Sequence, residues 1–187
     1  MIRINVPHIF LVLIFFLIFS FLYSSQTAWE PAQQGNKVIF IRHSIAPGGG
    51  DPSGFKINDC KTQRNLSKEG IIQSKKIGKL FVQNNIKIDQ VLTSQWCRCK
   101  DTAKHAFKVF KEFDALNSTF QSPFDKNEAQ QIKDLKSFIS TWNGNGKNLV
   151  LITHYSIITA VTDAIPGSGE IVITDKKLKV LSTIATN

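Results

Sequence analysis

The chain has 187 residues, with 23 Lys and Arg against 14 Asp and Glu, a formal net charge of +9 and a hydrophobic content of 42%. This length fits one domain, and the hydrophobic content excludes a chain that is disordered throughout. A multi-pass membrane protein is excluded because only one long apolar run occurs, and no internal period indicates a repeat architecture. The basic residues are mostly scattered Lys without interleaved aromatics, so we expect no nucleic-acid binding.

The long apolar run covers residues 9–23, after a short segment that carries Arg3 and before the small, polar stretch 24–28. This order of charge, apolar run and small residues is typical of a secretory signal. The run could also extend towards the roughly 20 residues of a membrane span, over residues 6–24. We therefore expect residues 1–28 to be a cleaved signal peptide or an N-terminal anchor. Either predicts export, to the periplasm or to the outward face of the inner membrane.

Export affects the interpretation of the three cysteines, Cys60, Cys97 and Cys99. Outside the cytosol, three cysteines predict one disulfide and one free thiol. Cys97 and Cys99 flank a single residue and rarely pair with each other, so we expect Cys60 to pair with one of them. A metal site is a weaker alternative, because no second pair of ligands lies near the Cys-x-Cys motif.

The rest of the chain alternates short apolar runs with amphipathic stretches. After a polar linker at residues 29–36, we expect one domain over residues 37–187. Its strands are predicted at residues 37–42, 90–94 and 148–153, with a terminal hairpin at 171–174 and 179–184. Helices are predicted at residues 68–83, 98–110, 128–142 and 156–164, and a glycine-rich loop at 44–65. This order predicts a three-layer α/β sandwich with a mostly parallel central sheet.

Three of the predicted strands end in residues that can do chemistry. The first strand ends at Arg42, and His43 and Ser44 follow it. The second strand leads into Ser94 and Arg98, and the third strand leads into His154. Ligands of parallel sheets bind beyond the carboxyl ends of the strands, so we expect these side chains to meet at one rim.

The arginines at this rim indicate an anion. The chain has 19 Lys but only four Arg, and two of the four, Arg42 and Arg98, stand at strand ends. Arg binds a phosphate through a planar fork, whereas Lys offers a mobile point charge. A site rich in Arg and His without clustered carboxylates favours a phosphoryl group over a divalent metal, and His can carry a covalent intermediate.

Three motifs, in this order, resemble the signature of the histidine phosphatase superfamily, which includes phosphoglycerate mutases, phosphohistidine phosphatases and acid phosphatases. They are Arg42-His43-Ser44, Ser94-x3-Arg98-x3-Thr102-Ala103 and Thr153-His154. The resemblance spans about residues 37–184 and implies a phosphoglycerate mutase-like fold. It implies that His43 is a nucleophile that forms a phosphohistidine, and that Arg42, Arg98 and His154 bind the phosphoryl oxygens. It implies no metal or other cofactor.

The chain departs from the family pattern at two points. Ser44 stands where the first motif usually has Gly. The general acid is also missing from its usual places, since residues 115–118 contain no carboxylate and Tyr155 follows the second histidine. The candidates that remain are Glu170, which we prefer, then Asp51, and then Asp114.

Further motifs resemble a subgroup of small bacterial members that are often exported. They are Ala46-Pro47-Gly48-x-Gly50-Asp51-Pro52, the run at residues 59–67 and Trp96-Cys97-Arg98. Arg64 within the run, like Ser44, is a candidate for holding the substrate, although a surface salt bridge of Arg64 is an open alternative. We expect a metal-independent phosphatase that hydrolyses phosphomonoesters of unknown identity through His43. The alternatives are a phosphohistidine protein phosphatase and a non-catalytic phosphate-binding domain.

Overall fold

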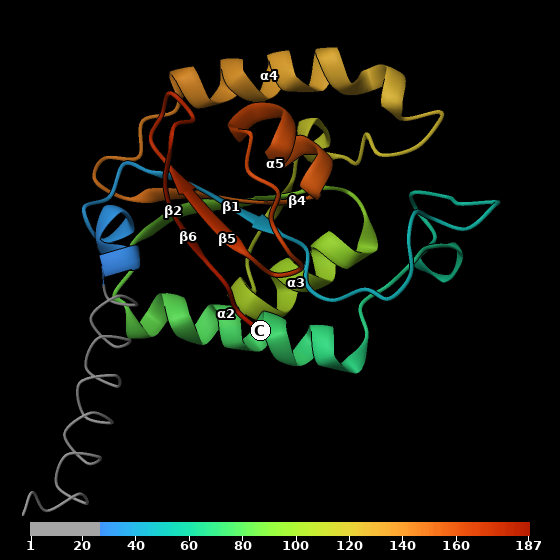
Figure 1. Ribbon diagram of the computed structural model, residues 1–187, viewed down its shortest axis with the longest axis horizontal. Helices are drawn as coiled ribbons and strands as arrows, with labels where there is room; N and C mark the ends of the chain where they lie inside the picture. Colours follow the sequence, from blue (N-terminus) through green and yellow to red (C-terminus); the bar gives the residue numbers. More distant parts are fainter. Residues whose placement is uncertain (1–26) are drawn as a thin grey trace, which may run out of the picture.

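The computed structural model describes residues 27–187, so the expected signal or anchor lies almost entirely outside the described part of the chain. The described residues form one six-stranded sheet with helices on both faces (Figure 1). No helix between residues 27 and 187 is long and apolar enough to cross a membrane.

The sheet has the strand order β3-β2-β4-β1-β5-β6. Its strands are β1 (Val38–Arg42), β2 (Ile88–Thr93), β3 (Lys111–Glu112), β4 (Asn148–Thr153), β5 (Ile171–Thr174) and β6 (Val180–Ile184). The strands from β3 to β1 pair in parallel, and β5 and β6 extend the sheet in antiparallel fashion. The mostly parallel sheet and the terminal hairpin are therefore confirmed, while the short edge strand β3 was not expected.

The pairing of β1 with β4 fixes the position of the first and third motifs. The register places Arg42 opposite Thr153, and the backbone N–H of His43 donates to the Thr153 carbonyl at 2.9 Å. His43 and His154 therefore leave the sheet side by side. β2 pairs with the other edge of β4, which brings Ser94 to the same end of the sheet, its N–H donating to the Ile152 carbonyl.

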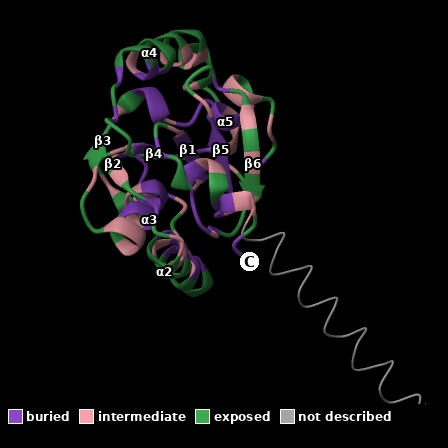
Figure 2. Cartoon of the chain, turned by 90° about the vertical axis from the view of Figure 1, so that its left-hand side faces the viewer, coloured by how far each residue is buried: buried purple, intermediate pink, exposed green. Residues whose placement is uncertain are grey.

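The helices form the outer two layers. They are α2 (Lys68–Gln83), α3 (Cys97–Phe107), α4 (Glu128–Thr141) and α5 (Tyr155–Thr162), with short 3-10 turns at Cys60–Thr62, Asp114–Leu116 and Asp125–Asn127. Figure 1 shows α2 and α3 on one face of the sheet and α4 and α5 on the other. Side chains alternate along β1, so Ile39 and Ile41 pack in the core with α2 and α3, while Val38 and Phe40 pack with α4 and α5. The central strands are buried and the outer helix surfaces exposed (Figure 2), and the three-layer sandwich is confirmed.

The segment expected to be a linker, residues 29–36, is instead part of the folded domain. Residues 27–33 are helical, and Trp29 and Ala32 are buried in the same core as α2 and α3. The ring of Trp29 lies 5.3 Å from the ring of Phe81, centroid to centroid. The Ala32 carbonyl accepts a hydrogen bond from the Asn148 side chain at 2.8 Å. The segment has a polar composition, which suggested a linker, because Trp29 and Ala32 are its only buried positions among residues 27–33.

Replacement of Trp29 tests whether this helix stabilises the domain. Trp29→Ala should lower the free energy of unfolding of the full chain by about 3–5 kcal/mol, because it removes a large buried side chain. Urea denaturation measures the change. Val82→Ala, at a position that is 77% exposed on α2, is the control and should change the free energy by less than about 0.5 kcal/mol. Equal effects of the two substitutions would contradict a core role for Trp29.

Candidate active site

His43 is presented to a pocket at the carboxyl end of the sheet. It is buried, and its Nδ1 lies 2.9 Å from the carbonyl oxygen of Ser44. A carbonyl only accepts hydrogen bonds, so Nδ1 carries the ring proton and donates. The lone pair of the neutral imidazole is therefore on Nε2, the atom that is free to attack.

Hydrogen bonds from α2 and α3 hold Ser44, the residue that follows His43. The N–H of Ser44 donates to Thr102 Oγ1 at 3.0 Å, and Ser74 Oγ donates to Ser44 Oγ at 2.8 Å. Ser44 is fully buried, and its hydroxyl does not line the pocket. The expectation that Ser44 binds phosphate is thus not supported by its position. The Ser44 side chain points towards Ser74 on α2. The Ser44 carbonyl orients the ring of His43.

His154 follows β4 and lies beside His43, with 5.4 Å between the ring centroids. Arg98 Nη2 lies 3.4 Å from His154 Nδ1 and can only donate, so Nδ1 accepts and the proton of the neutral ring is on Nε2. Nε2 donates to Ser94 Oγ at 2.9 Å, and that hydroxyl donates to Asn117 Oδ1 at 3.2 Å. This chain fixes the orientation of the second histidine.

Both imidazoles are held in the neutral form. Burial lowers the pKa of His43 well below its usual 6.5, and the positive charge of Arg98 lowers this pKa further, ahead of Arg64 and Arg42. Burial also lowers the pKa of His154 well below 6.5, again with Arg98 as the next cause. A neutral His43 is the form that can act as a nucleophile.

Arg98, at the start of α3, is buried and paired with Asp51. Its Nη1 donates to Asp51 Oδ1 at 2.6 Å, and its Nη2 to Asp51 Oδ2 at 3.2 Å. The carboxylate also accepts from the indole N–H of Trp96 at 2.9 Å. Two N–H donors on one carboxylate fix the plane of the guanidinium group.

Two further arginines line the pocket. Arg42 Nη1 donates to the Pro166 carbonyl at 2.9 Å, and its guanidinium carbon lies 5.4 Å from the centre of the Tyr155 ring. Arg64 Nε donates to the Gly50 carbonyl at 2.7 Å, and its Nη1 donates to the carbonyl of Ala46. Arg64 therefore supports the glycine-rich loop and faces the pocket, which favours a role at the site over a surface salt bridge.

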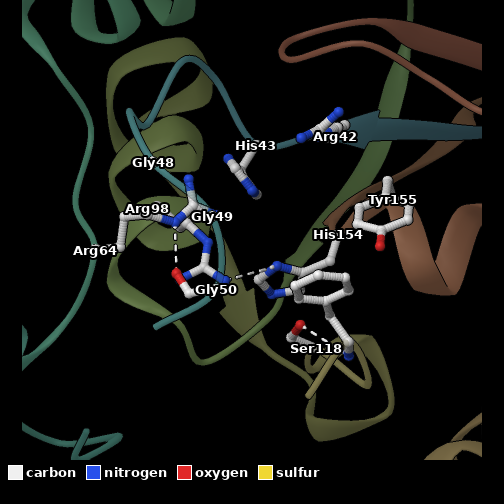
Figure 3. Close-up of a pocket in the computed structure, with 11 residues that line it drawn as sticks. Arg42, His43, Gly48, Gly49, Gly50, Arg64, Arg98, Ser118, His154 and Tyr155 are labelled. Carbon is white, nitrogen blue, oxygen red and sulfur yellow. Dashed lines mark hydrogen bonds between the residues drawn. The ribbon is translucent and has the colours of Figure 1, made fainter. Parts of the chain in front are cut away.

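The pocket is small and positively charged (Figure 3). Its volume is about 100 Å³, well below the roughly 300–1,000 Å³ of pockets that enclose a whole small-molecule ligand. Its lining residues are Arg42, His43, Gly48, Gly49, Gly50, Arg64, Arg98, Ser118, Phe120, His154 and Tyr155. Within residues 27–187, Nε of Arg42 and Nε of Arg98 are buried without a hydrogen-bond partner. Unpartnered guanidinium N–H groups are costly when buried, and an anion would satisfy them.

The structure does not bring the preferred acid to this pocket. Glu170 Oε2 accepts from the backbone N–H of Gly167 at 2.7 Å, and its side chain is not among those that line the pocket. Its backbone carbonyl, directly before β5, accepts a hydrogen bond from the Arg42 N–H at 3.2 Å. Asp114 lines a separate surface hollow. Asp51 is close to the site, but both its oxygens already accept from Arg98.

A disulfide ties the glycine-rich loop to the helix that carries Arg98. Cys60 is bonded to Cys97, which is one of the two pairings expected. The N–H of Cys97 also donates to Gln63 Oε1 at 2.9 Å. The third cysteine, Cys99, is buried beside His154, with its sulfur 3.4 Å from Nε2. Burial raises the pKa of the Cys99 thiol to about 12.

Several lining residues carry no sequence signal. Ser118 and Phe120 come from an irregular segment after the 3-10 turn Asp114–Leu116, so no periodicity pointed to them. Tyr155 stands directly after His154, but no motif in the sequence indicated a role for its ring. In the described residues no group of three or more His, Cys, Asp or Glu is arranged to hold a metal ion.

The fold resembles that of solved phosphatases and mutases. The protein histidine phosphatase SixA, complexed with tungstate, matches with a TM-score of 0.56 and 12% identity over 80% of this chain and 97% of its own. Phosphoglycerate mutase from Thermus thermophilus matches with a TM-score of 0.55 and 15% identity, over 81% of this chain and 99% of its own. No protein-family model and no curated protein sequence matches the chain. The chain therefore has the fold that these members of the histidine phosphatase superfamily share.

Proposed function

We propose that the chain is a metal-independent histidine phosphatase that hydrolyses a phosphomonoester through a phosphohistidine on His43. The observation that carries this proposal is a neutral imidazole whose Nε2 lone pair is free, inside a pocket lined by three arginines. The shared fold, found among phosphatases and mutases, supports it.

The reaction would proceed in two steps. His43 Nε2 forms a bond to phosphorus while the bond from phosphorus to the leaving oxygen breaks, and the oxygen takes a proton from solvent water. Water then attacks the phosphohistidine, the N–P bond breaks, and inorganic phosphate leaves. Arg42, Arg64 and Arg98 stabilise the charge on the phosphoryl oxygens in both steps. A bound phosphoryl dianion would also favour protonation of His154, whose Nδ1 could then donate to it.

A specific observation favours a second substrate class, a phosphohistidine on a protein. Among residues 27–187, no carboxylate side chain lines the pocket, so none stands ready to protonate a leaving oxygen. A leaving group that departs easily needs little help from an acid. The similar fold of SixA, described as a protein histidine phosphatase, is consistent with this candidate.

We further propose that the chain is exported and acts outside the cytosol, free in the periplasm or anchored to the inner membrane. Pairing of Cys60 with Cys97 supports this location, because structural disulfides persist in oxidising compartments. The order of charge, apolar run and small residues at residues 1–28 supports export independently.

His43→Ala tests the nucleophile. In the full chain, assayed with chelator present, it should lower the turnover of p-nitrophenyl phosphate by about 10³-fold or more and abolish acid-labile phosphate on the protein, detected by ³¹P NMR. His105→Ala, outside the pocket, is the control and should keep both. Phosphate binding without turnover or label in the wild type would favour the non-catalytic binding domain. A label that persists in His43→Ala would assign the nucleophile to another residue.

The acid limb of the pH profile tests the state of His43. Because burial and Arg98 lower its pKa well below 6.5, the nucleophile stays neutral at pH 6. The second-order rate constant of phosphoenzyme formation at low substrate concentration reports the unliganded protein. Corrected for the substrate's own ionisation, it should stay level from pH 8 to 6 and fall only in more acidic solution. Rapid-quench measurements give this rate. A half-fall near pH 6.5 would show an ordinary imidazole and contradict the proposal.

Two carboxylate variants separate an acid from a positioning residue. Glu170→Gln should leave kcat/KM within about twofold, because this carboxylate bonds to Gly167 outside the pocket. Asp51→Asn should lower phosphate affinity by about tenfold, because it removes the charge that fixes Arg98. Kinetics with phenyl phosphates of graded leaving-group pKa, together with calorimetry of phosphate binding, measure both. Selective slowing of the poorest leaving groups in Glu170→Gln would restore Glu170 as the acid.

A further inference from the structure

The size of the pocket limits which part of a substrate can enter it. The pocket has a volume of about 100 Å³, and of its lining residues His43, Arg98 and His154 are buried whereas Gly48, Gly49 and Phe120 are exposed. A phosphoryl group fills such a space, so the group to which it is attached must lie at the mouth. The residues at the mouth therefore contact the leaving group and select it.

The mouth has two chemically different walls. One is the backbone of Gly48, Gly49 and Gly50, and a side chain at Gly49 would meet no atom within 4 Å. The other carries the aromatic rings of Phe120 and Tyr155. Figure 3 shows the three glycines on one side of the two histidines and Tyr155 on the other. The space beside this wall is open at Gly49, whereas a Cβ at Gly48 would lie 3.6 Å from Arg64 Cδ and one at Gly50 would lie 2.5 Å from Gln121 Oε1.

The two rings form a pair. Their centroids are 5.5 Å apart with 60° between the ring planes, and Arg42 lies against Tyr155. Phe120 is 52% exposed, although its neighbours Ser118 and Thr119 are buried. Thr119 Oγ1 donates to Glu128 Oε2 at 2.7 Å, which ties this segment to the start of α4. Phe120 is thus an apolar ring in a fixed position beside a phosphate-sized pocket.

Exposure alone would not distinguish Phe120, since single exposed hydrophobic side chains are common. Ile72, Val82 and Val109 are more exposed than Phe120. None of these three lines the pocket of the two histidines. Phe120 differs from them because it pairs with the ring of Tyr155 and lines the pocket.

We propose that the Phe120–Tyr155 pair is a specificity subsite for a planar aromatic leaving group, which packs on the exposed ring of Phe120 while the phosphoryl group occupies the arginine-lined pocket. This inference rests on the proposed function, because it takes the pocket to hold the phosphoryl group. Aromatic rings in offset or edge-to-face contact gain about 0.5–1.5 kcal/mol beyond the burial of area, about 2- to 13-fold in affinity.

Competitive ligands that are not hydrolysed test the subsite apart from the chemistry. Phenylphosphonate and cyclohexylphosphonate have rings of the same carbon number, but only the first is planar and aromatic. With the full chain, calorimetry should show phenylphosphonate binding about three- to tenfold more tightly. In Phe120→Leu, which keeps an apolar side chain, the ratio of the two dissociation constants should fall to within twofold of one. Val109→Ala, an exposed position outside the pocket, is the control and should keep the ratio of the wild type.

Inorganic phosphate is the third ligand, and it separates failure of this inference from failure of the proposed function. Its affinity should be the same in the wild type and Phe120→Leu, which also shows that the variant is folded. Phosphate binding without a preference for the phenyl ring would overturn the subsite and leave the phosphatase proposal standing. The same ratio in Phe120→Leu as in the wild type would mean that the aromatic ring is not what selects the ligand. No binding of phosphate at all would overturn both.

Discussion

The parallel pairing of β1 with β4 is the constraint on which the site depends. Its register places Arg42 opposite Thr153, so the residues that follow them, His43 and His154, leave the sheet next to each other at the same edge. A shift of one residue would turn every side chain of β1 to the other face of the sheet. The alternating cores above and below β1 oppose such a shift, because each face is filled by its own set of apolar side chains. Packing far from the pocket thus holds the two imidazole rings 5.4 Å apart.

The electrostatics of the site follow from placing positive charge around buried imidazoles. Arg98 is buried, and Asp51 is the carboxylate that compensates its charge. Burial and the arginines both disfavour a charged histidine, so the same groups that would bind a phosphoryl anion also keep His43 neutral. The arginine charges would therefore serve both binding and nucleophile activation, while burial is the larger cause of the lowered pKa of His43. Asp51 belongs to the glycine-rich loop, so the position of that loop also decides how Arg98 is held.

The sequence predicted every described strand except the short edge strand β3, together with the layers and the strand-end residues, because a buried strand and its reactive end are contiguous in the chain. Arg42, His43, Arg98 and His154 were expected together, and the structure brings them together. Residues that act through non-local contacts were not predictable in this way. The role of Asp51 depends on an ion pair with Arg98 across 47 positions, and Phe120 comes from an irregular segment.

Glu170 was preferred as the acid because it stands directly before a predicted strand. That position does not determine where the side chain of a turn residue points. The helical conformation of residues 27–33 was not predicted, because two buried positions are too few to show the 3.6-residue spacing of a helix.

Burial of the third thiol has a consequence for the covalent structure of the chain. Disulfide exchange requires a thiolate, and burial raises the pKa of the Cys99 thiol to about 12, so this thiol stays protonated at neutral pH. Cys99 stands two positions from Cys97 but is a poor attacking group while the domain is folded. Cys99 therefore does not attack the disulfide between Cys60 and Cys97 while the domain is folded. The packing of α3, which carries both Cys97 and Cys99, keeps the Cys99 thiol unreactive.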